Sequence, residues 1–441
     1  MSKIPVTAVF DIGKTNKKFF LFDDKLAEVH SSYIRLDAIP DEDNFPSEPL
    51  APLEEWMLTT FKEALQSPDY EIKRLNFSCH GASFVHTDEN GNPATPLYDY
   101  LKPFPEDLLN RFYEENGGKM TFCRATSSPP LAMLNSGLQL YFIKYTKPEL
   151  FKKIAHSFHF PQYLSFLFTG EIVSDYTSIG CHTGLWDYEA NDYHEWVDRE
   201  GIRKLLPPIV PGNTLLKTKP ELGNIPCGIG VHDSSSALLP YIEQEKEPFA
   251  LLSTGTWSIC INPFNKTKLT KKELKCDCLH FLSIKGDPIK ISRLFIGEEH
   301  KYQVEKLYEH FKMPLGTYKK LKFSAELYEK VKNSAVKRIR FQYLKPEDYG
   351  IDHPTESTWH LIPEFTEAYY SFIHELTDLQ TAAIKLVLDN APVGRLFIDG
   401  GFNANDIFVE MLRKKLPGVK IIPSDFPNGS ALGAAMLVSM D

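Results

Sequence analysis

The chain has 441 residues, of which 42% are hydrophobic and 24% are charged, which suits a globular protein of two domains with separate cores. Acidic side chains outnumber basic ones by 58 to 49, and the net charge of −9 repels a phosphate backbone, so we expect no nucleic-acid partner. The sequence opens without the stages of a secretory signal, and no apolar run approaches the roughly 20 residues that cross a bilayer. We therefore expect a cytoplasmic protein that does not bind membranes.

The first half of the chain begins with two strand-like runs, residues 6–11 and 18–23, joined by a loop that carries Gly13. Helical apolar spacing follows at 55–65, and a buried strand at 72–77 leads into Ser78-Cys-His-Gly81. The pattern then predicts a strand at 82–87 and helices at 131–145 and 148–168. These helices are expected to cover a sheet.

The second half of the chain repeats the opening pattern. Residues 249–261 again form a strand, a Gly-Thr turn and a strand, about half a chain length after the first hairpin. This echo predicts two similar domains, residues 1–237 and 238–441, with a hinge near residues 233–240. A long helix at 364–389 follows, and the remaining pattern predicts strands at 395–399 and 419–422 with two closing helices.

The seven cysteines form an odd, scattered set, as expected for reduced thiols in a cytosolic enzyme. Cys276, Cys278 and His280 have a spacing that zinc ligands can adopt, but no second Cys pair accompanies them. Alternating side chains on a strand give the same spacing, so the cluster alone does not establish a metal site.

Three glycine-containing turns follow predicted strands. They are Asp11-Ile-Gly13-Lys14-Thr15, Ser253-Thr-Gly255-Thr256 and Asp399-Gly400-Gly401. Backbone N–H groups in such turns can surround phosphate oxygens, and glycine lets the backbone approach closely. Because the turns come from both halves of the chain, they indicate a nucleoside triphosphate held between two domains.

The first turn resembles the end of a P-loop, but the position that needs the first glycine of that motif is Ala8, inside a strand. Asp11, at the end of the strand, instead suits a carboxylate that faces hydrated Mg²⁺ beside the phosphates. The alternative role for Asp11 is to cap the turn.

Asp233 lies between a Gly-rich strand and a helical run, in Gly228-Ile-Gly-Val-His-Asp233. An Asp there can cap the helix, and it can also accept the proton of a hydroxyl that attacks a phosphate. The two roles are compatible at one helix N-terminus. We interpret Asp233 as the general base of a phosphoryl transfer.

Polar residues at the ends of other strands are candidates for binding a sugar. His80 and Asp99 offer the donors and acceptors that sugar hydroxyls need, and Asp175 belongs to the polar segment Ser174–Ser178. The alternative for each residue is a structural polar group with internal hydrogen bonds.

Five motifs, in the correct order and over nearly the whole chain, resemble those of the FGGY carbohydrate kinase family. The motifs are Asp11-Ile-Gly-Lys-Thr-Asn16, Cys79-His-Gly81, Gly230-Val-His-Asp233, Ser253-Thr-Gly-Thr256 and Gly400-Gly-Phe-Asn-Ala-Asn405, followed by Ala431–Ala435. The resemblance implies an α/β, actin-like (ribonuclease H-like) fold, with ATP and sugar in the cleft between two domains that each contain a mixed sheet flanked by helices.

The resemblance also assigns roles to individual residues. It implies Asp233 as general base, Asp11 as the partner of Mg²⁺, Thr15 and Thr256 as phosphate contacts, and Gly401 with Asn405 as nucleoside contacts. The full set of expected ATP contacts is Gly13, Lys14, Thr15, Asn16, Gly255, Thr256, Gly400, Gly401 and Asn405. The expected sugar contacts are His80, Gly81, Asp99, Asp175 and His232.

Within the family, segments such as His232–Ala237 and Phe160–Ser165 are most similar to rhamnulokinases, which suggests L-rhamnulose phosphorylated on its C1 hydroxyl. L-Fuculose, xylulose and ribulose stay open, because Lys14 and Asn16 replace small hydroxyl residues of the family motif and residues 301–364 match poorly. The rival functions are an actin-fold ATPase and a non-catalytic sugar sensor. The expected partners are ATP and a sugar, for a monomer or a homodimer.

Overall fold

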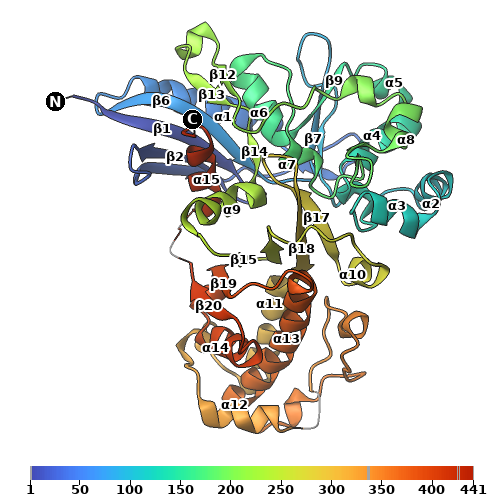
Figure 1. Ribbon diagram of the computed structural model, residues 1–441, viewed down its shortest axis with the longest axis vertical. Helices are drawn as coiled ribbons and strands as arrows, with labels where there is room; N and C mark the ends of the chain where they lie inside the picture. Colours follow the sequence, from blue (N-terminus) through green and yellow to red (C-terminus); the bar gives the residue numbers. More distant parts are fainter. Residues whose placement is uncertain (1, 335–337, 425, 427, 441) are drawn as a thin grey trace. The chain divides into compact units, whose positions relative to one another are not determined.

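The computed structural model describes residues 2–334, 338–424, 426 and 428–440, and the chain divides into two compact units (Figure 1). The first unit comprises Met1–Gln244, His280–Pro288 and Asn428–Asp441, and the second comprises Glu245–Leu279 and Ile289–Pro427. These two units are groups of residues in close contact. The two domains expected from the sequence, residues 1–237 and 238–441, stay a prediction.

The first unit is built on a seven-stranded sheet with the order β12-β13-β6-β1-β2-β3, in which β14 also pairs with β6. Strand β1 (Ile4–Ile12) is antiparallel to β2 (Lys17–Asp23) and parallel to β6 (Tyr70–Cys79). Its apolar run is almost continuous because both faces of the sheet are covered. Phe10 points into the core beneath α1 (Leu50–Leu65) and α6 (Phe160–Thr169), whereas Val9 points into the core beneath α9 and α15.

The other elements of this unit extend the seven-stranded sheet (β3, β12, β13 and β14), form smaller sheets (β4-β5-β8, β7-β9 and β10-β11) or are helices. Its remaining strands are β3 (Glu28–Ile34), β4 (Ile39–Pro40), β5 (Pro46–Glu48), β7 (Phe84–Thr87), β8 (Leu97–Tyr98), β9 (His156–His159), β10 (Trp186–Asp187), β11 (Asp192–Tyr193), β12 (Leu215–Lys217), β13 (Pro226–Gly228) and β14 (Val231–His232). Its remaining α-helices are α2 (Glu106–Glu115), α3 (Lys119–Ala125), α4 (Gly137–Thr146), α5 (Pro148–Phe151), α7 (Tyr176–Ile179), α8 (Glu195–Arg199), α9 (Asp233–Gln244) and α15 (Gly429–Leu437).

The prediction of one helix over 148–168 is wrong. Strand β9 interrupts it, because residues 156–159 pair antiparallel with β7 and separate α5 from α6. Helix α6 ends where predicted, at Gly170, whose left-handed backbone (φ +80°) stops the helix.

The second unit repeats the arrangement at the centre of the first. Strand β15 (Phe249–Thr254) is antiparallel to β16 (Ser258–Asn262) and parallel to β19 (Arg395–Gly400), as β1 is to β2 and β6. The neighbouring strands of its sheet include β18 (Pro288–Leu294), β16, β15, β19 and β20 (Lys420–Pro423), in that order. The repeated hairpin that the sequence predicts is confirmed.

Helix α13 (Phe365–Leu388) forms the centre of the second core, and its predicted extent is confirmed. The other elements are α10 (Lys271–Lys275), α11 (Ile296–Phe311), α12 (Ala325–Lys332) and α14 (Asp406–Lys415), and β17 (Cys278–Leu282) has its first two residues in this unit and the rest in the first. Within the described residues, no helix combines the length and apolar character needed to span a membrane.

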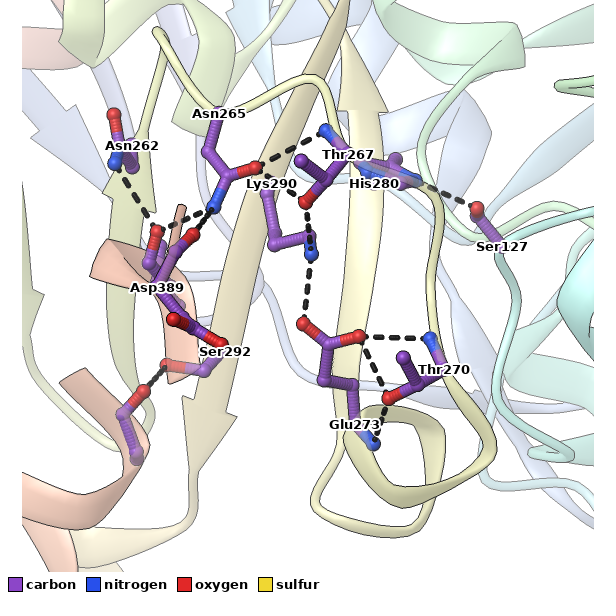
Figure 2. A network of polar contacts seen from close by, with 12 residues as sticks. Ser127, Asn262, Asn265, Thr267, Thr270, Glu273, His280, Lys290, Ser292 and Asp389 are labelled. Carbon is purple, nitrogen blue, oxygen red and sulfur yellow. Dashed lines mark hydrogen bonds and ion pairs between the residues drawn. The ribbon is translucent and has the colours of Figure 1, made fainter. Parts of the chain in front are cut away.

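A buried polar network joins α10 to the sheet of the second unit (Figure 2). The Lys290 Nζ atom donates to Glu273 Oε1 and to Thr267 Oγ1, both at 2.7 Å, and the Lys290 side chain is 2% exposed. Glu273 also accepts from the backbone N–H of Thr270, which caps α10. Each member of the network has a partner, as burial of charge requires.

Candidate active site

Asp11 lies near the carboxyl end of β1, opposite Lys18 on β2 and Ser78 on β6. Its Oδ1 atom accepts a hydrogen bond from Ser430 Oγ at 3.1 Å. Burial and the negative charge of Asp233 raise the pKa of Asp11 to about 6, although Lys18 and Ser430 act in the opposite direction. The ionised form of Asp11 is therefore not fully stabilised by Lys18 and Ser430, and a bound cation would stabilise it further.

Asp233 reaches the same edge of the sheet through β14. Strand β14 pairs in parallel with β6, so that Val231 lies opposite Ser78, the residue that also lies opposite Asp11. The carboxyl ends of parallel strands are where α/β sheets place ligands. Asp233 is the first residue of α9, its side chain is 36% exposed, and its Oδ1 lies 3.5 Å from His232 Nε2.

The turn between β1 and β2 is held by a lysine that the sequence analysis missed. Gly13 N donates to Asn16 O at 3.0 Å, and the Nζ atom of buried Lys17 donates to the carbonyls of Gly13 and Lys14 at 3.0 and 2.9 Å. Thr15 is exposed at the tip. Lys17 thus fixes the carbonyls toward the protein, which leaves the tip of the turn free to contact a ligand.

Lys14 and Asp99, predicted separately, are brought together. Lys14 Nζ lies 2.9 Å from Asp99 Oδ2 and 2.9 Å from Glu48 Oε1, and 4.9 Å from the centre of the Tyr100 ring. Burial opposes the charge of Lys14, but the two carboxylates outweigh it and hold the pKa of Lys14 above its usual value. Glu48, which also pairs with Lys17 Nζ at 3.1 Å, is the second residue that sequence reasoning missed.

His80, Gly81 and His232 are also brought together. His80 Nδ1 donates to Gly81 O at 3.0 Å, and its buried Nε2 has no hydrogen-bond partner among the described residues. A Cβ on Gly81 would lie 2.8 Å from His232 Nε2, so a larger residue at position 81 would displace the His232 ring. Burial lowers the pKa of both histidines below the usual value, although nearby carboxylates act against it. Both rings are therefore expected to be neutral at pH 7.

The carboxylate of Asp175 is fully buried, and all of its contacts are with groups that hold the local backbone and Gln162. It accepts from the backbone N–H groups of Thr177 and Ser178, at 2.9 and 3.0 Å, and from Gln162 Nε2 at 3.0 Å. The hydroxyl of Thr177 also donates to it and accepts from His232 N at 3.1 Å. The carboxylate thus supports the backbone of His232.

The glycine turns of the second unit meet at a cavity of about 480 Å³. Its lining residues are Gly255, His300, Tyr318, Lys319, Leu321, Gly401, Phe402, Ala404, Asn405 and Asp406. Gly400 holds the turns together, because its φ is +82° and a Cβ there would lie 1.8 Å from Thr254 O. Thr254 Oγ1 in turn accepts from Phe402 N at 3.1 Å. Thr256 is exposed beside Gly255.

Asn405 is positioned by two hydrogen bonds. Its Oδ1 caps α14 by accepting from Phe408 N at 3.2 Å, and its Nδ2 donates to the Tyr369 hydroxyl at 2.8 Å. His300 Nε2 lies 3.0 Å from the same hydroxyl, and burial lowers the pKa of His300 to about 4. Among the described residues, His, Cys, Asp and Glu nowhere form a group of three that could hold a metal ion, the Cys276–His280 segment included.

The fold and these motifs define the class of protein, and comparison with known proteins identifies the family. Residues 6–240, more than half of the chain, match the N-terminal domain of the FGGY family of carbohydrate kinases. The chain belongs to this family, whose members use ATP, generally with a divalent metal, to phosphorylate an alcohol group.

Curated relatives are named rhamnulokinase. The protein of Oceanobacillus iheyensis is 25% identical over 199 residues, which cover 43% of this chain and 41% of the relative. That of Enterobacter sp. (strain 638) is 28% identical over 195 residues, which cover 43% of this chain and 39% of the relative. The matched region therefore spans less than half the length of these relatives.

Solved structures confirm the expected two-domain fold. A carbohydrate kinase from Novosphingobium aromaticivorans superposes with a TM-score of 0.78 at 21% identity, covering 99% of this chain and 92% of that chain. A xylulose kinase from Lactobacillus acidophilus gives 0.80 at 15% identity, covering 99% and 89%. At these identities the likeness shows the fold, which is the mixed α/β, actin-like architecture that the motifs imply.

Proposed function

We propose that this protein transfers the γ-phosphoryl group of ATP to a primary hydroxyl of a ketose, with L-rhamnulose as the first candidate and L-rhamnulose 1-phosphate as the product. Membership of the family supports the reaction type. The rhamnulokinase likeness supports the choice of sugar, since the family match covers 6–240, the part that carries His80, Asp99 and Asp233.

The observation that carries the proposal is the pair of carboxylates near the carboxyl ends of β1 and β14, two strands that both run parallel to β6. We assign Asp233 as the general base, because it is accessible, stands at a helix N-terminus and has a neutral histidine beside it. A proton leaving the attacking hydroxyl would move to the Asp233 carboxylate as the new O–P bond forms and the bond to ADP breaks.

Asp11 fits the role of partner to Mg²⁺, since its pKa is raised by burial and by Asp233, and a cation would relieve both effects. Because protein ligands do not cluster in threes in the described chain, Asp11 would hold the ion through water, as proposed from the sequence. When bound, the ion would neutralise phosphate charge.

For the nucleotide, we propose that Gly13, Lys14, Thr15 and Asn16 contact phosphates, with Lys14 exchanging one of its carboxylate partners for a phosphate oxygen. Gly255, Thr256, Gly400, Gly401 and Asn405 would contact the rest of ATP from the second unit. The cavity at Gly255, Gly401 and Asn405 supports this assignment.

For the sugar, we propose that hydroxyls bind His80, Gly81, Asp99 and His232. The unpartnered Nε2 of His80, 3.9 Å from Glu48 Oε1, supports a hydroxyl donating to one of these acceptors. Asp175 would act through His232, whose backbone it supports by way of Thr177.

The proposal is tested by measuring ADP formation with a panel of purified compounds. L-Rhamnulose, L-fuculose, D- and L-xylulose, D- and L-ribulose, gluconate and glycerol would each be supplied with ATP and Mg²⁺, and products identified by phosphorus NMR. We expect ADP formation to require a sugar, with the highest kcat/KM for L-rhamnulose. ADP formation that is equal without any sugar would instead support an ATPase, and binding of a ketose without turnover would support a sensor.

A further inference from the structure

A second cavity of about 480 Å³ lies in the first unit, formed by residues from 176 to 209 and by none of the residues assigned above to ATP or sugar. Its size falls in the range of small-molecule sites. Its walls include the aromatic residues Trp186, Tyr176 and Tyr193 and the prolines Pro207 and Pro208. The Trp186 ring makes edge contacts with both tyrosine rings, each at 5.9 Å between centroids.

Two polar groups of these aromatic residues lack hydrogen-bond partners among the described residues. Trp186 is 4% exposed, yet its Nε1–H and the hydroxyl of Tyr193 find no hydrogen-bond partner among the described residues. A buried donor without a partner carries a free-energy cost, and because both atoms are shielded from solvent, a ligand oxygen would remove this cost through a small shift of the walls. By contrast, Trp196, in the same unit, donates its Nε1–H to Gly184 O at 2.7 Å.

The rim of the cavity is polar and carries both signs of charge. The Arg203 guanidinium lies 4.9 Å over the Tyr193 ring and makes two contacts with Asp192, at 2.8 and 3.3 Å, and one with Asp198 at 3.3 Å. One cation shared by two carboxylates leaves a negative balance, which disfavours a phosphate or another anion. All these groups are about half exposed, so their ion pairs are easily exchanged for other partners.

We propose that this cavity is a second binding site, distinct from the catalytic one, for a neutral carbohydrate. Aromatic rings and prolines pack against the C–H faces of a sugar ring, while Arg203, Asp192 and the indole N–H offer the paired donors and acceptors that hydroxyl groups require. An anionic compound such as ATP or a sugar phosphate is disfavoured by the negative balance of charge at the rim.

The cavity is also linked to the backbone next to Asp233. Its wall is tied to the segment before α7, because Ser174 N donates to Pro208 O at 2.8 Å and Val210 N donates to Ser174 O at 2.9 Å. Tyr176 opens α7 and lines the cavity, and the next residue, Thr177, accepts from His232 N. A ligand that moves Tyr176 would therefore act on the neighbour of Asp233.

The test measures binding to the full chain by saturation-transfer NMR and titration calorimetry, with L-rhamnose, D-glucose, D-fructose and maltose as probes. The variants are Arg203→Ala and Trp186→Phe in the cavity, and His80→Ala in the proposed catalytic sugar site. We expect at least one probe to bind the wild type. The same probe is expected to bind both cavity variants about tenfold or more weakly than the wild type, and to bind His80→Ala with unchanged affinity.

Trp186→Phe and Trp196→Phe provide a matched stability control. Both substitutions remove buried ring volume, but Trp196→Phe also orphans the Gly184 carbonyl, so Trp196→Phe is expected to lower the Tm more than Trp186→Phe, whose Nε1 has no internal partner. The proposal is overturned if no probe binds the wild type, or if binding survives in Arg203→Ala and Trp186→Phe but is lost in His80→Ala. Neither result counts against phosphorylation of a ketose, and loss of binding in His80→Ala would support the proposed catalytic sugar site.

Discussion

At the scale of single residues, Asp233 carries the proposed proton transfer and Asp233→Asn removes it with little change in shape. General bases contribute about two to four orders of magnitude to rate, so we expect kcat with the best ketose to fall by that factor. Steady-state kinetics would measure the loss, with Asp24→Asn, an exposed carboxylate, as the control of equal charge change. A kcat for Asp233→Asn within about threefold of wild type would exclude Asp233 as the base.

Asp11 predicts a pH dependence of stability with a defined sign. Its pKa of about 6 in the folded protein lies above its ordinary value of 3.8, so folding favours the protonated form. The contribution of protonated Asp11 to the free energy of unfolding is complete below about pH 4 and is lost as the pH rises through about 6.

Asp11→Asn keeps the shape of the side chain but cannot ionise. Without nucleotide or metal, we expect it to unfold at a higher temperature than wild type at about pH 8, and the difference to vanish at about pH 4. Thermal unfolding at a series of pH values would measure this. A stability difference that does not vary with pH would show that Asp11 is not the titrating group.

At the scale of elements, helices α9 and α15 pack closely enough that glycine is needed between them. A Cβ on Gly433 would lie 1.9 Å from the backbone carbonyl of Ser236. We expect Gly433→Ala to reduce the free energy of unfolding by about 1–3 kcal/mol, because one of the helices must shift.

The matched control for this substitution is Gly418→Ala, since a Cβ there meets no atom within 4 Å. It is expected to change stability by less than about 0.5 kcal/mol. Urea unfolding of both variants would compare them, and equal effects would show that the α9–α15 contact is looser than the structure has it.

The helices and strands could be predicted from the sequence where an apolar pattern extends over many consecutive residues and is bounded by turn residues. The hairpin of β1 and β2, its copy at β15 and β16, and α13 follow directly from apolar runs and turn residues. Strand β9 was missed because four residues rich in His and Phe carry no strand period, and only pairing with β7, distant in sequence, makes them a strand.

The same limit explains which site residues escaped sequence reasoning. Asp11 and Asp233 could be found because each ends an apolar strand next to glycine. Glu48 could not, because it lies on a three-residue strand whose partner, β8, is remote in sequence. Tyr318 belongs to residues 301–364, which match the family poorly, and His300 directly precedes them.

At the scale of the whole molecule, the proposal that turns from both units serve one ATP makes a prediction for hydrogen exchange. With a non-hydrolysable ATP analogue, we expect slower exchange of amides in 13–16 of the first unit and in both 255–256 and 400–402 of the second. Protection confined to one unit would contradict a shared triphosphate. Apo protein with sugar alone serves as the control.

The last described residues, 428–440, pack with the first unit of the chain, where Ala431, Ala434 and Leu437 share a core with Val9 and Phe20 of the first two strands. During translation, the early strands emerge first, and although α9 can cover part of that side of their sheet, the part beneath α15 must wait for almost the entire polypeptide to be made. A nascent chain therefore carries an apolar surface that a chaperone can recognise until synthesis nears its end. Premature termination before residue 428 would leave it permanently uncovered, a route to aggregation.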